Sequence, residues 1–404
     1  MMELFLLEHK KLWRKTSTKI SVFLCFLYLV VFGSILSFQW FSFGSSDDYT
    51  SAFGNNFDGY DMIRKSQEYS LMFGGELTDQ SLQKMVGDYQ DIGAAGVDRE
   101  LEKTDVHIIN SWLGTLYPEL LDTGSYKTMM NYVELEKLTG FYERRQNIIE
   151  DFLENNGQNG DEKEYLLQIN AKVKEPFRYE WTEGWSNLLG SIVPDMGVVM
   201  ALFLAIVLSS LFAGEWYNNT SSLLLTTKNG WKKIAFAKIG VGLSFTAEFF
   251  AILTAGNLVS QIFFLGTAGW DMPIQTIKLI AIAPMNMLQA EIYEYAFVFF
   301  GVIGFAGVVM FISAKTRSNV LALLFSLAVV YGPMMIAEYL PYGVQKALDL
   351  IPLVGSGADI FRTNTFCVFG KYVWSPYLLI AVPVLVGVLC LPFAVKSWSR
   401  RLRV

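Results

Sequence analysis

The sequence predicts an all-α integral membrane protein that carries one large water-facing insertion, and three observations support this class. Several stretches of about 20 residues contain at most one charged side chain, which is the length a helix needs to cross a bilayer core about 30 Å thick. Of the 404 residues, 52% are hydrophobic and only 17% are charged, whereas soluble proteins have about 25% charged residues. Residues 43–188 hold 27 acidic and 13 basic side chains, and the remainder holds 11 acidic and 19 basic ones. A single soluble globule, a disordered chain and a nucleic-acid binder with a general basic face are therefore excluded.

Six segments are apolar and long enough to span a membrane. Four of them contain no Asp, Glu, Lys or Arg, and the other two contain one acid each, Asp195 and Glu248. We therefore predict six transmembrane helices, at residues 20–41, 188–214, 239–266, 295–314, 318–337 and 375–395.

The basic residues beside these spans predict the orientation of the chain, because Lys and Arg are retained on the cytoplasmic side. They cluster in the N-terminal segment, in two loops and in the tail, at residues 1–19, 215–238, 315–317 and 396–404. Both termini are then cytoplasmic, and the protein is predicted to lie in the plasma membrane. The segments on the outer side are residues 42–187, 267–294 and 338–374.

The acidic insertion at 42–187 is expected to be a mostly helical extracytoplasmic domain. It opens with a linker-like stretch rich in Gly, Ser, Asp and Asn, through about Tyr60. Apolar residues at helical spacing then predict a helix capped by Thr78 and a longer one over residues 127–155. Its net charge of −14 suits either the attraction of cationic molecules or a solvated face that stays away from anionic lipid.

The sequence contains no recognisable catalytic or metal-binding motif. The chain has no G-x-x-x-x-G-K-[ST], no H-E-x-x-H, no G-x-S-x-G and no Cys/His cluster, and its two histidines are His9 and His107. We therefore predict that the chain is not an enzyme and binds no cofactor or metal itself. No nucleic-acid partner is expected.

The segment after the second predicted span has an informative order of residues. An acid ends the span, and a polar turn, an apolar triplet, a second turn and a basic amphipathic run follow. This order resembles the loop of ABC-2 type permeases, the membrane subunits of bacterial ABC exporters, in which F-x-x-E, G-T, L-L-x-T, a basic pair, I and K follow one another. The matching residues are Phe212, Glu215, Thr220, Leu224, Leu225, Thr227, Lys232, Lys233, Ile234 and Lys238. Asn219 replaces the usual glycine, and Lys232 replaces the usual arginine.

The resemblance implies six spans of the ABC-2 exporter type, with the large outer insertion seen in a subset of members. It also implies that residues 215–238 couple the spans to a separate ABC ATPase, which would bind ATP and Mg. The coupling residues would be Glu215, Thr220, Leu224, Leu225, Thr227, Lys232, Lys233 and Lys238. A second permease subunit, identical or related, would complete a transporter for a hydrophobic or amphipathic peptide, antibiotic or lipid. An ordinary basic loop would explain the lysines but not the order of the other residues.

Two further features bear on this expectation. Residues 1–19 have apolar side chains on one helical face and charged ones on the other, which predicts an amphipathic helix on the inner membrane surface. Within the membrane, Glu248 is either part of a substrate pathway or a hydrogen-bonded packing residue, because an acid in a span costs about 2.5–3.5 kcal/mol unless it faces protein or water.

An alternative function belongs to a different class. A membrane-anchored sensor or immunity scaffold could bind a ligand through the outer domain without transporting it. The residue order between Glu215 and Lys238 argues against this reading, as does the lack of any recognisable output domain on the cytoplasmic side.

Overall fold

The computed structural model describes residues 1–33, 74–94, 106–121, 129–220, 232–357 and 364–400, together with Tyr60, Ile63, Arg64, Gln67, Glu68 and Ser70. These residues are mostly helical, as predicted. Residues 34–41 of the first predicted span and the linker-like stretch before Tyr60 lie outside this part of the chain.

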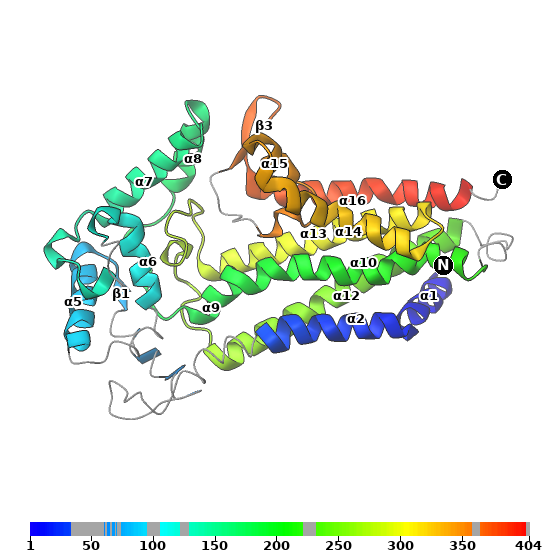
Figure 1. Cartoon of the computed structure of the whole chain (residues 1–404), viewed down its shortest axis with the longest axis horizontal. Helices are drawn as coiled ribbons and strands as arrows, with labels where there is room; N and C mark the ends of the chain where they lie inside the picture. The colour runs from blue at the N-terminus through cyan, green and yellow to red at the C-terminus, as the bar shows by residue number, and fades with distance from the viewer. Residues whose placement is uncertain are drawn as a thin grey trace.

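A bundle of long apolar helices forms the body of the protein (Figure 1). In the described residues, five helices are long and apolar enough to cross a membrane, and a bent N-terminal pair raises the number to six if it counts as one span. The five are α10 (Val193–Tyr217), α12 (Lys232–Leu265), α13 (Met287–Lys315), α14 (Asn319–Ile336) and α16 (Ser375–Arg400). The number and apolar composition of these helices support the predicted class, a helical multi-pass membrane protein.

Several helices extend beyond the apolar windows from which the spans were predicted. Helix α10 continues to Tyr217, α12 begins at Lys232, and α13 begins at Met287. A hydropathy window ends at the first charged residues, but backbone hydrogen bonding continues through them. Glu215 and Lys238 consequently lie on helices rather than in a loop.

Helices α13 and α16 form the most extensive helix pair among the described residues. Gly304 and Gly307 of α13 bring the two backbones together: a Cβ added at Gly304 would overlap the carbonyl oxygen of Pro383, and one added at Gly307 would lie 2.5 Å from that of Gly387. The glycine spacing in the fourth predicted span therefore serves packing within the chain, as small residues do in membrane helices.

The N-terminal pair consists of α1 (Met2–Arg14) and α2 (Thr16–Phe26), which continues as the π-helical turn η1 (Leu27–Phe32). Lys15 has ψ of 132°, an extended conformation, and the two halves meet at an angle of 66°. Helix α1 packs along α12, with Phe5 against Gly240. The helix predicted over residues 1–19 is shorter than expected, because the chain is extended at Lys15 and residues 16–19 belong to α2.

Residues 74–94, 106–121 and 129–182 form a body that we call the lobe. It lies at one end of the bundle, whereas both ends of the chain lie at the opposite end, which we call the terminal end (Figure 1). Its elements are β1 (Gly75–Glu76), α5 (Asp79–Ala94), α6 (Val106–Leu116), η3 (Pro118–Leu120), η4 (Met129–Asn131), η5 (Leu135–Lys137), α7 (Phe141–Asn155), α8 (Asp161–Asn170) and β2 (Arg178–Tyr179), which pairs antiparallel with β1.

The two helices predicted in the lobe had different outcomes. Thr78 caps α5 as expected, because its Oγ1 accepts a hydrogen bond of 3.1 Å from the Ser81 amide. The prediction of a single helix over residues 127–155 is wrong. Gly140 has φ of +72°, a left-handed conformation that interrupts a helix, so only Phe141–Asn155 is α-helical.

The segment between α14 and α16 contains a β-hairpin that the sequence did not predict. It follows the short elements η8 (Ala337–Tyr339), α15 (Tyr342–Leu348) and η9 (Val354–Gly357). Strands β3 (Thr365–Val368) and β4 (Lys371–Trp374) pair antiparallel. The two residues between them, Phe369 and Gly370, have φ of +50° and +76°, as the tightest hairpin turns require. The usual Asn-Gly signal is absent because Phe occupies the first position.

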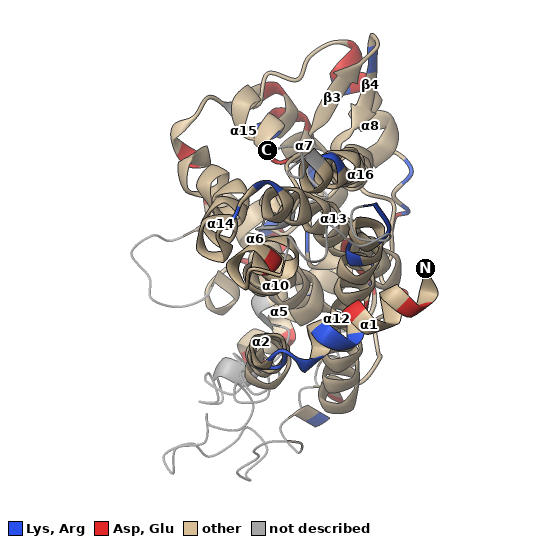
Figure 2. Ribbon diagram, turned by 90° about the vertical axis from the view of Figure 1, so that its right-hand side faces the viewer, with Lys and Arg blue, Asp and Glu red and all other residues tan. Residues whose placement is uncertain are grey.

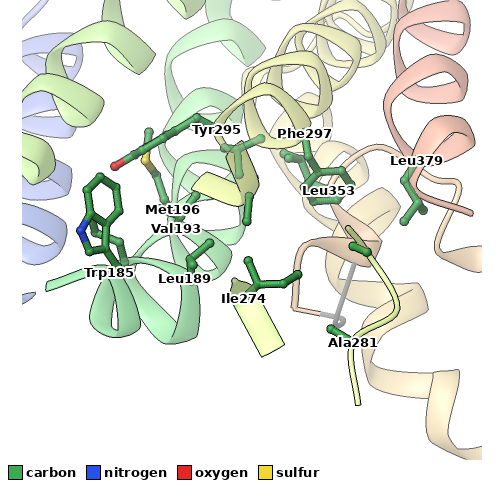
Figure 3. Close-up of a cluster of buried hydrophobic side chains, with 14 of the residues drawn as sticks. Trp185, Leu189, Val193, Met196, Ile274, Ala281, Tyr295, Phe297, Leu353 and Leu379 are labelled. Atoms are coloured by element: carbon green, nitrogen blue, oxygen red, sulfur yellow. The ribbon is translucent and has the colours of Figure 1, made fainter. Parts of the chain in front are cut away.

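The lobe is attached to the bundle through a shared hydrophobic core and through buried hydrogen bonds. Short elements α9 (Glu183–Asn187) and η6 (Leu188–Ile192) lead from the lobe into α10. Figure 3 shows Leu189 and Val193 near Ile274, which belongs to η7 (Ile274–Thr276) in the segment between α12 and α13. From the lobe, Trp112 Nε1 donates to the Thr276 carbonyl oxygen at 2.7 Å.

Arg145 of α7 forms the second buried attachment, and its side chain is 1% exposed. Its guanidinium donates to the carbonyl oxygens of Leu279 and Ala281, at 2.8 and 2.9 Å, and to Asn170 Oδ1 at 3.0 Å. Burial lowers the pKa of Arg145 to about 10, so that the group stays charged at neutral pH. The segment after α12 is thereby held by the lobe.

Replacing Arg145 with Met should lower the free energy of unfolding by about 3 kcal/mol. The Leu279 carbonyl oxygen and Asn170 Oδ1 lose their guanidinium donor, and the Ala281 carbonyl oxygen keeps only the amide of Gln275. Thermal unfolding of the purified chain in detergent would measure this, and hydrogen exchange should rise in residues 274–283. Lys137→Met, at a side chain 51% exposed, is the control and should leave both unchanged. Equal protection of residues 274–283 in the wild type and the Arg145 variant would contradict the assigned attachment.

Candidate functional site

A buried group of charged side chains lies at the terminal end of the bundle and contains three of the residues singled out in the sequence. Glu215, in the last turn of α10, is 4% exposed. Its Oε1 lies 2.8 Å from Nζ of Lys238 on α12, whose side chain is 1% exposed. Thr220 donates its hydroxyl to Glu215 Oε2. Glu215, Thr220 and Lys238, separated by up to 23 positions, therefore meet at one place.

Helix α1 completes this group. Lys11 Nζ donates to Glu215 Oε1, and Lys238 Nζ donates to Glu8 Oε2 at 2.8 Å. We call Glu8, Lys11, Glu215, Thr220 and Lys238 the charge cluster. Two carboxylates and two ammonium groups balance each other, which offsets the large desolvation cost of burying any one of them. In Figure 2, which looks along the bundle from this end, basic residues of α1 lie beside α12.

The turn after α10 explains why Asn219 can occupy the position where the resembling family usually has glycine. Asn219 has φ of +56°, in the left-handed region. Gly adopts this conformation without strain, and Asn is among the few other residues that adopt it readily. The turn brings Thr220 back toward Glu215, whose carbonyl oxygen accepts the Thr220 amide at 3.0 Å. Asn219 therefore fits the left-handed conformation that this turn requires.

Glu248 also contacts α1, about three turns further along α12. Its carboxylate accepts hydrogen bonds from Trp13 Nε1 at 3.0 Å and from Ser244 Oγ at 2.7 Å, and it lies 2.9 Å from His9 Nε2. Its side chain is 39% exposed. The acid thus has protein partners, which is the packing alternative considered for it, and a role in a substrate pathway stays a prediction.

The remaining predicted site residues divide into two sets. Lys232 and Lys233 are exposed in the first turn of α12, away from the buried part of the cluster. Leu224, Leu225 and Thr227 lie outside the described residues. Sequence reasoning did not single out Glu8 and Lys11, although both lie on the polar face of the predicted amphipathic helix, which could have indicated them.

The charge cluster is suited to mechanical linkage rather than to chemistry on a substrate. Its one hydroxyl group, that of Thr220, donates to a Glu215 carboxylate that also pairs with Lys11 and Lys238, and the described residues include no group of His, Cys, Asp and Glu that could hold a metal ion. It connects the end of α10 and the start of α12 to α1. Glu215 and Lys238 form a buried ion pair, Lys238 also pairs with Glu8, and Lys11, whose side chain is 49% exposed, pairs with Glu215 from the solvent side. A displacement of one of these elements must therefore move or break the contacts to the other two.

Comparisons with known proteins add no identification: no family model, no curated protein and no solved structure matches the chain.

Proposed function

We propose that the chain is the membrane-spanning permease subunit of an ABC transporter that exports a hydrophobic or amphipathic molecule, driven by ATP hydrolysed on a separate subunit. The observation that carries the proposal is the charge cluster. Residues at the two ends of the permease-like segment, Glu215 and Lys238, pair with each other and with α1. In this proposal the terminal end faces the cytoplasm and the lobe lies outside.

The cluster supports a coupling role because it surrounds the base of the segment that would contact the ATPase. The segment joins the end of α10, at Tyr217, to the start of α12, at Lys232, so a force applied to it reaches α10 and α12 directly. Through Lys11 and Glu8 the same force reaches α1. Exposed Lys232 and Lys233 supply a basic surface that a partner subunit could contact.

The burial of the spans supports a membrane setting and leaves room for a second permease subunit. In the apolar stretches of α10 and α13, 67% of the residues are buried within the chain, compared with 17% in α14 and 22% in α16. The exposed apolar side chains of α14 and α16 require lipid or another apolar surface. A second subunit, identical or related, would cover part of this surface, and an apolar cargo could pass between the two.

The proposal predicts that charge reversal at Lys232 and Lys233 weakens the contact with the ATPase. The chain would be co-expressed with the ABC ATPase encoded beside its gene, purified through a tag on the permease, and reconstituted in liposomes. The Lys232→Glu/Lys233→Glu variant should retain less than about a tenth of the ATPase, since each lost contact between close charges costs about 1 kcal/mol or more. Lys371→Glu, at an exposed position of β4, is the charge-matched control.

Two outcomes would contradict the proposal. If the double variant retains the ATPase and supports the wild-type rate of ATP hydrolysis, the basic surface is not the contact. If no ABC ATPase is encoded nearby and the chain binds a ligand through the lobe without transport, a membrane-anchored sensor or immunity scaffold is the better description.

A further inference from the structure

A cavity of about 420 Å³ lies between the lobe and the start of α13. One wall comes from the lobe residues that follow α8, and the other comes from the segment after α12 and the first turn of α13. Apolar side chains, among them Val173, Pro176 and Met285, contribute to its lining. A volume of this size accommodates a small organic ligand or the headgroup of a lipid.

The polar lining of the cavity is basic, although the insertion that supplies one wall is acidic. Lys172, Lys174 and Arg178 line it, and Asp271 is its one carboxylate. Arg178 is paired with Asp271 and with Glu180. Among the described residues no ion pair involves Lys172 or Lys174. Two ammonium groups without an ion-pair partner in the described part of the chain therefore border the cavity, which favours an anionic ligand.

The length of α13 places this cavity at the level of lipid headgroups if the bundle spans a membrane. A helix of 29 residues is about 43 Å long, whereas the hydrocarbon core is about 30 Å thick and the bilayer with its headgroups about 40–45 Å. With Lys315 at the opposite interface, the start of α13 lies among the headgroups. Trp270, which is 49% exposed, directly precedes Asp271 of the cavity lining, and exposed tryptophans are enriched at membrane interfaces.

Gln275 stabilises one wall of the cavity. It is fully buried beneath the lining and donates from Nε2 to the carbonyl oxygens of Ala281 and Ala283 at 3.0 and 2.8 Å. These two bonds fix the path of the segment after α12, which supplies that wall.

We propose that this cavity binds the headgroup of an anionic glycerophospholipid from the outer leaflet, with the phosphate between Lys172 and Lys174. The phosphate accepts hydrogen bonds from the two ammonium groups, and the apolar lining contacts the glycerol carbons. Phosphatidylglycerol, whose phosphate carries the single net charge of the headgroup, belongs to this class of lipid. The inference depends on the chain spanning a membrane but not on its being an ABC permease, so either can fail without the other.

The test is a calorimetric titration of short-chain phosphatidylglycerol into the full chain in a neutral detergent. The wild type should bind it saturably. Lys172→Gln/Lys174→Gln should weaken binding at least about tenfold, because two charge-assisted contacts to phosphate are lost. Lys84→Gln/Lys137→Gln removes two exposed lysines elsewhere in the lobe and should leave binding unchanged. Both variants should unfold at the wild-type temperature, because all four side chains are exposed.

Three results would overturn the proposal. Equal affinity of the wild type and the Lys172/Lys174 variant would show that the cavity does not hold the phosphate. Equal affinity for short-chain phosphatidylcholine would remove the argument from charge. Glycerol 1-phosphate bound as tightly as the lipid would assign the cavity to soluble phosphate esters. Binding of the lipid with little binding of glycerol 1-phosphate would support the lipid assignment.

Discussion

We expect Lys238→Met to lower the free energy of unfolding by about 3 kcal/mol. This value is at the lower end of the range for removing one partner of a buried ion pair. The loss is large because Glu215 stays buried at 4% exposure without the fully buried ammonium group that pairs with it. It is not larger because Lys11 still donates to the same carboxylate. Thermal and denaturant unfolding of the purified chain would measure the change.

A second variant separates the ion pair from a general loss of packing. Lys238→Met combined with Glu215→Gln removes both charges and should cost less than the sum of the two single changes, since the two residues are in contact. Lys233→Met, on the exposed side of the same helix, is the matched control and should be close to neutral. Additive costs in the double variant would show that Glu215 and Lys238 do not interact, and the charge cluster would lose its basis.

Gly304→Leu is expected to separate α13 from α16, with a loss of about 3 kcal/mol or more. Overpacking commonly costs about 1–3 kcal/mol, and here the new side chain would meet the backbone of Pro383 rather than the end of a flexible side chain. Backbone can move only if the whole helix moves. The unfolding temperature in detergent should fall, and cysteine pairs placed across α13 and α16 should cross-link less efficiently.

The control for this change is another glycine within a membrane helix. Gly332 of α14 has no atom within 4 Å of the position that a Cβ would occupy. Gly332→Leu should therefore cost clearly less than Gly304→Leu. Leu favours a helix more than Gly does, and this offsets the preference against a side chain directly before Pro333. If Gly304→Leu unfolds at the same temperature as Gly332→Leu, the close approach of α13 and α16 is not what stabilises the bundle.

The part of the fold that follows from local composition could be predicted. The apolar runs lie where the long helices are, and Thr78 caps α5 because its side chain acts within one helical turn. The β3–β4 hairpin was missed because Phe369 takes a left-handed conformation that its identity does not indicate. The helix expected over residues 127–155 was wrong because its apolar spacing continued across Gly140.

The candidate site shows the same division. The order of residues between Glu215 and Lys238 indicated a segment of interest, but pairing across the bundle depends on how α10, α12 and α1 pack. Glu8 and Lys11 are unremarkable charges on a polar helical face until that face contacts α12. Glu248 illustrates the opposite case, since an acid in an apolar run invited a functional reading and the structure supplies three nearby partners.

The attachment of the lobe determines which positions can vary in sequence among related chains. Trp112 and Arg145 donate to the backbone oxygens of Thr276, Leu279 and Ala281, not to their side chains. A main-chain acceptor is present whatever residue occupies a position. Related chains should therefore tolerate apolar exchanges at positions 279 and 281 with little effect on the position of the lobe. Trp112 and Arg145 should change rarely, and a change in either should be accompanied by a different backbone path in residues 276–281.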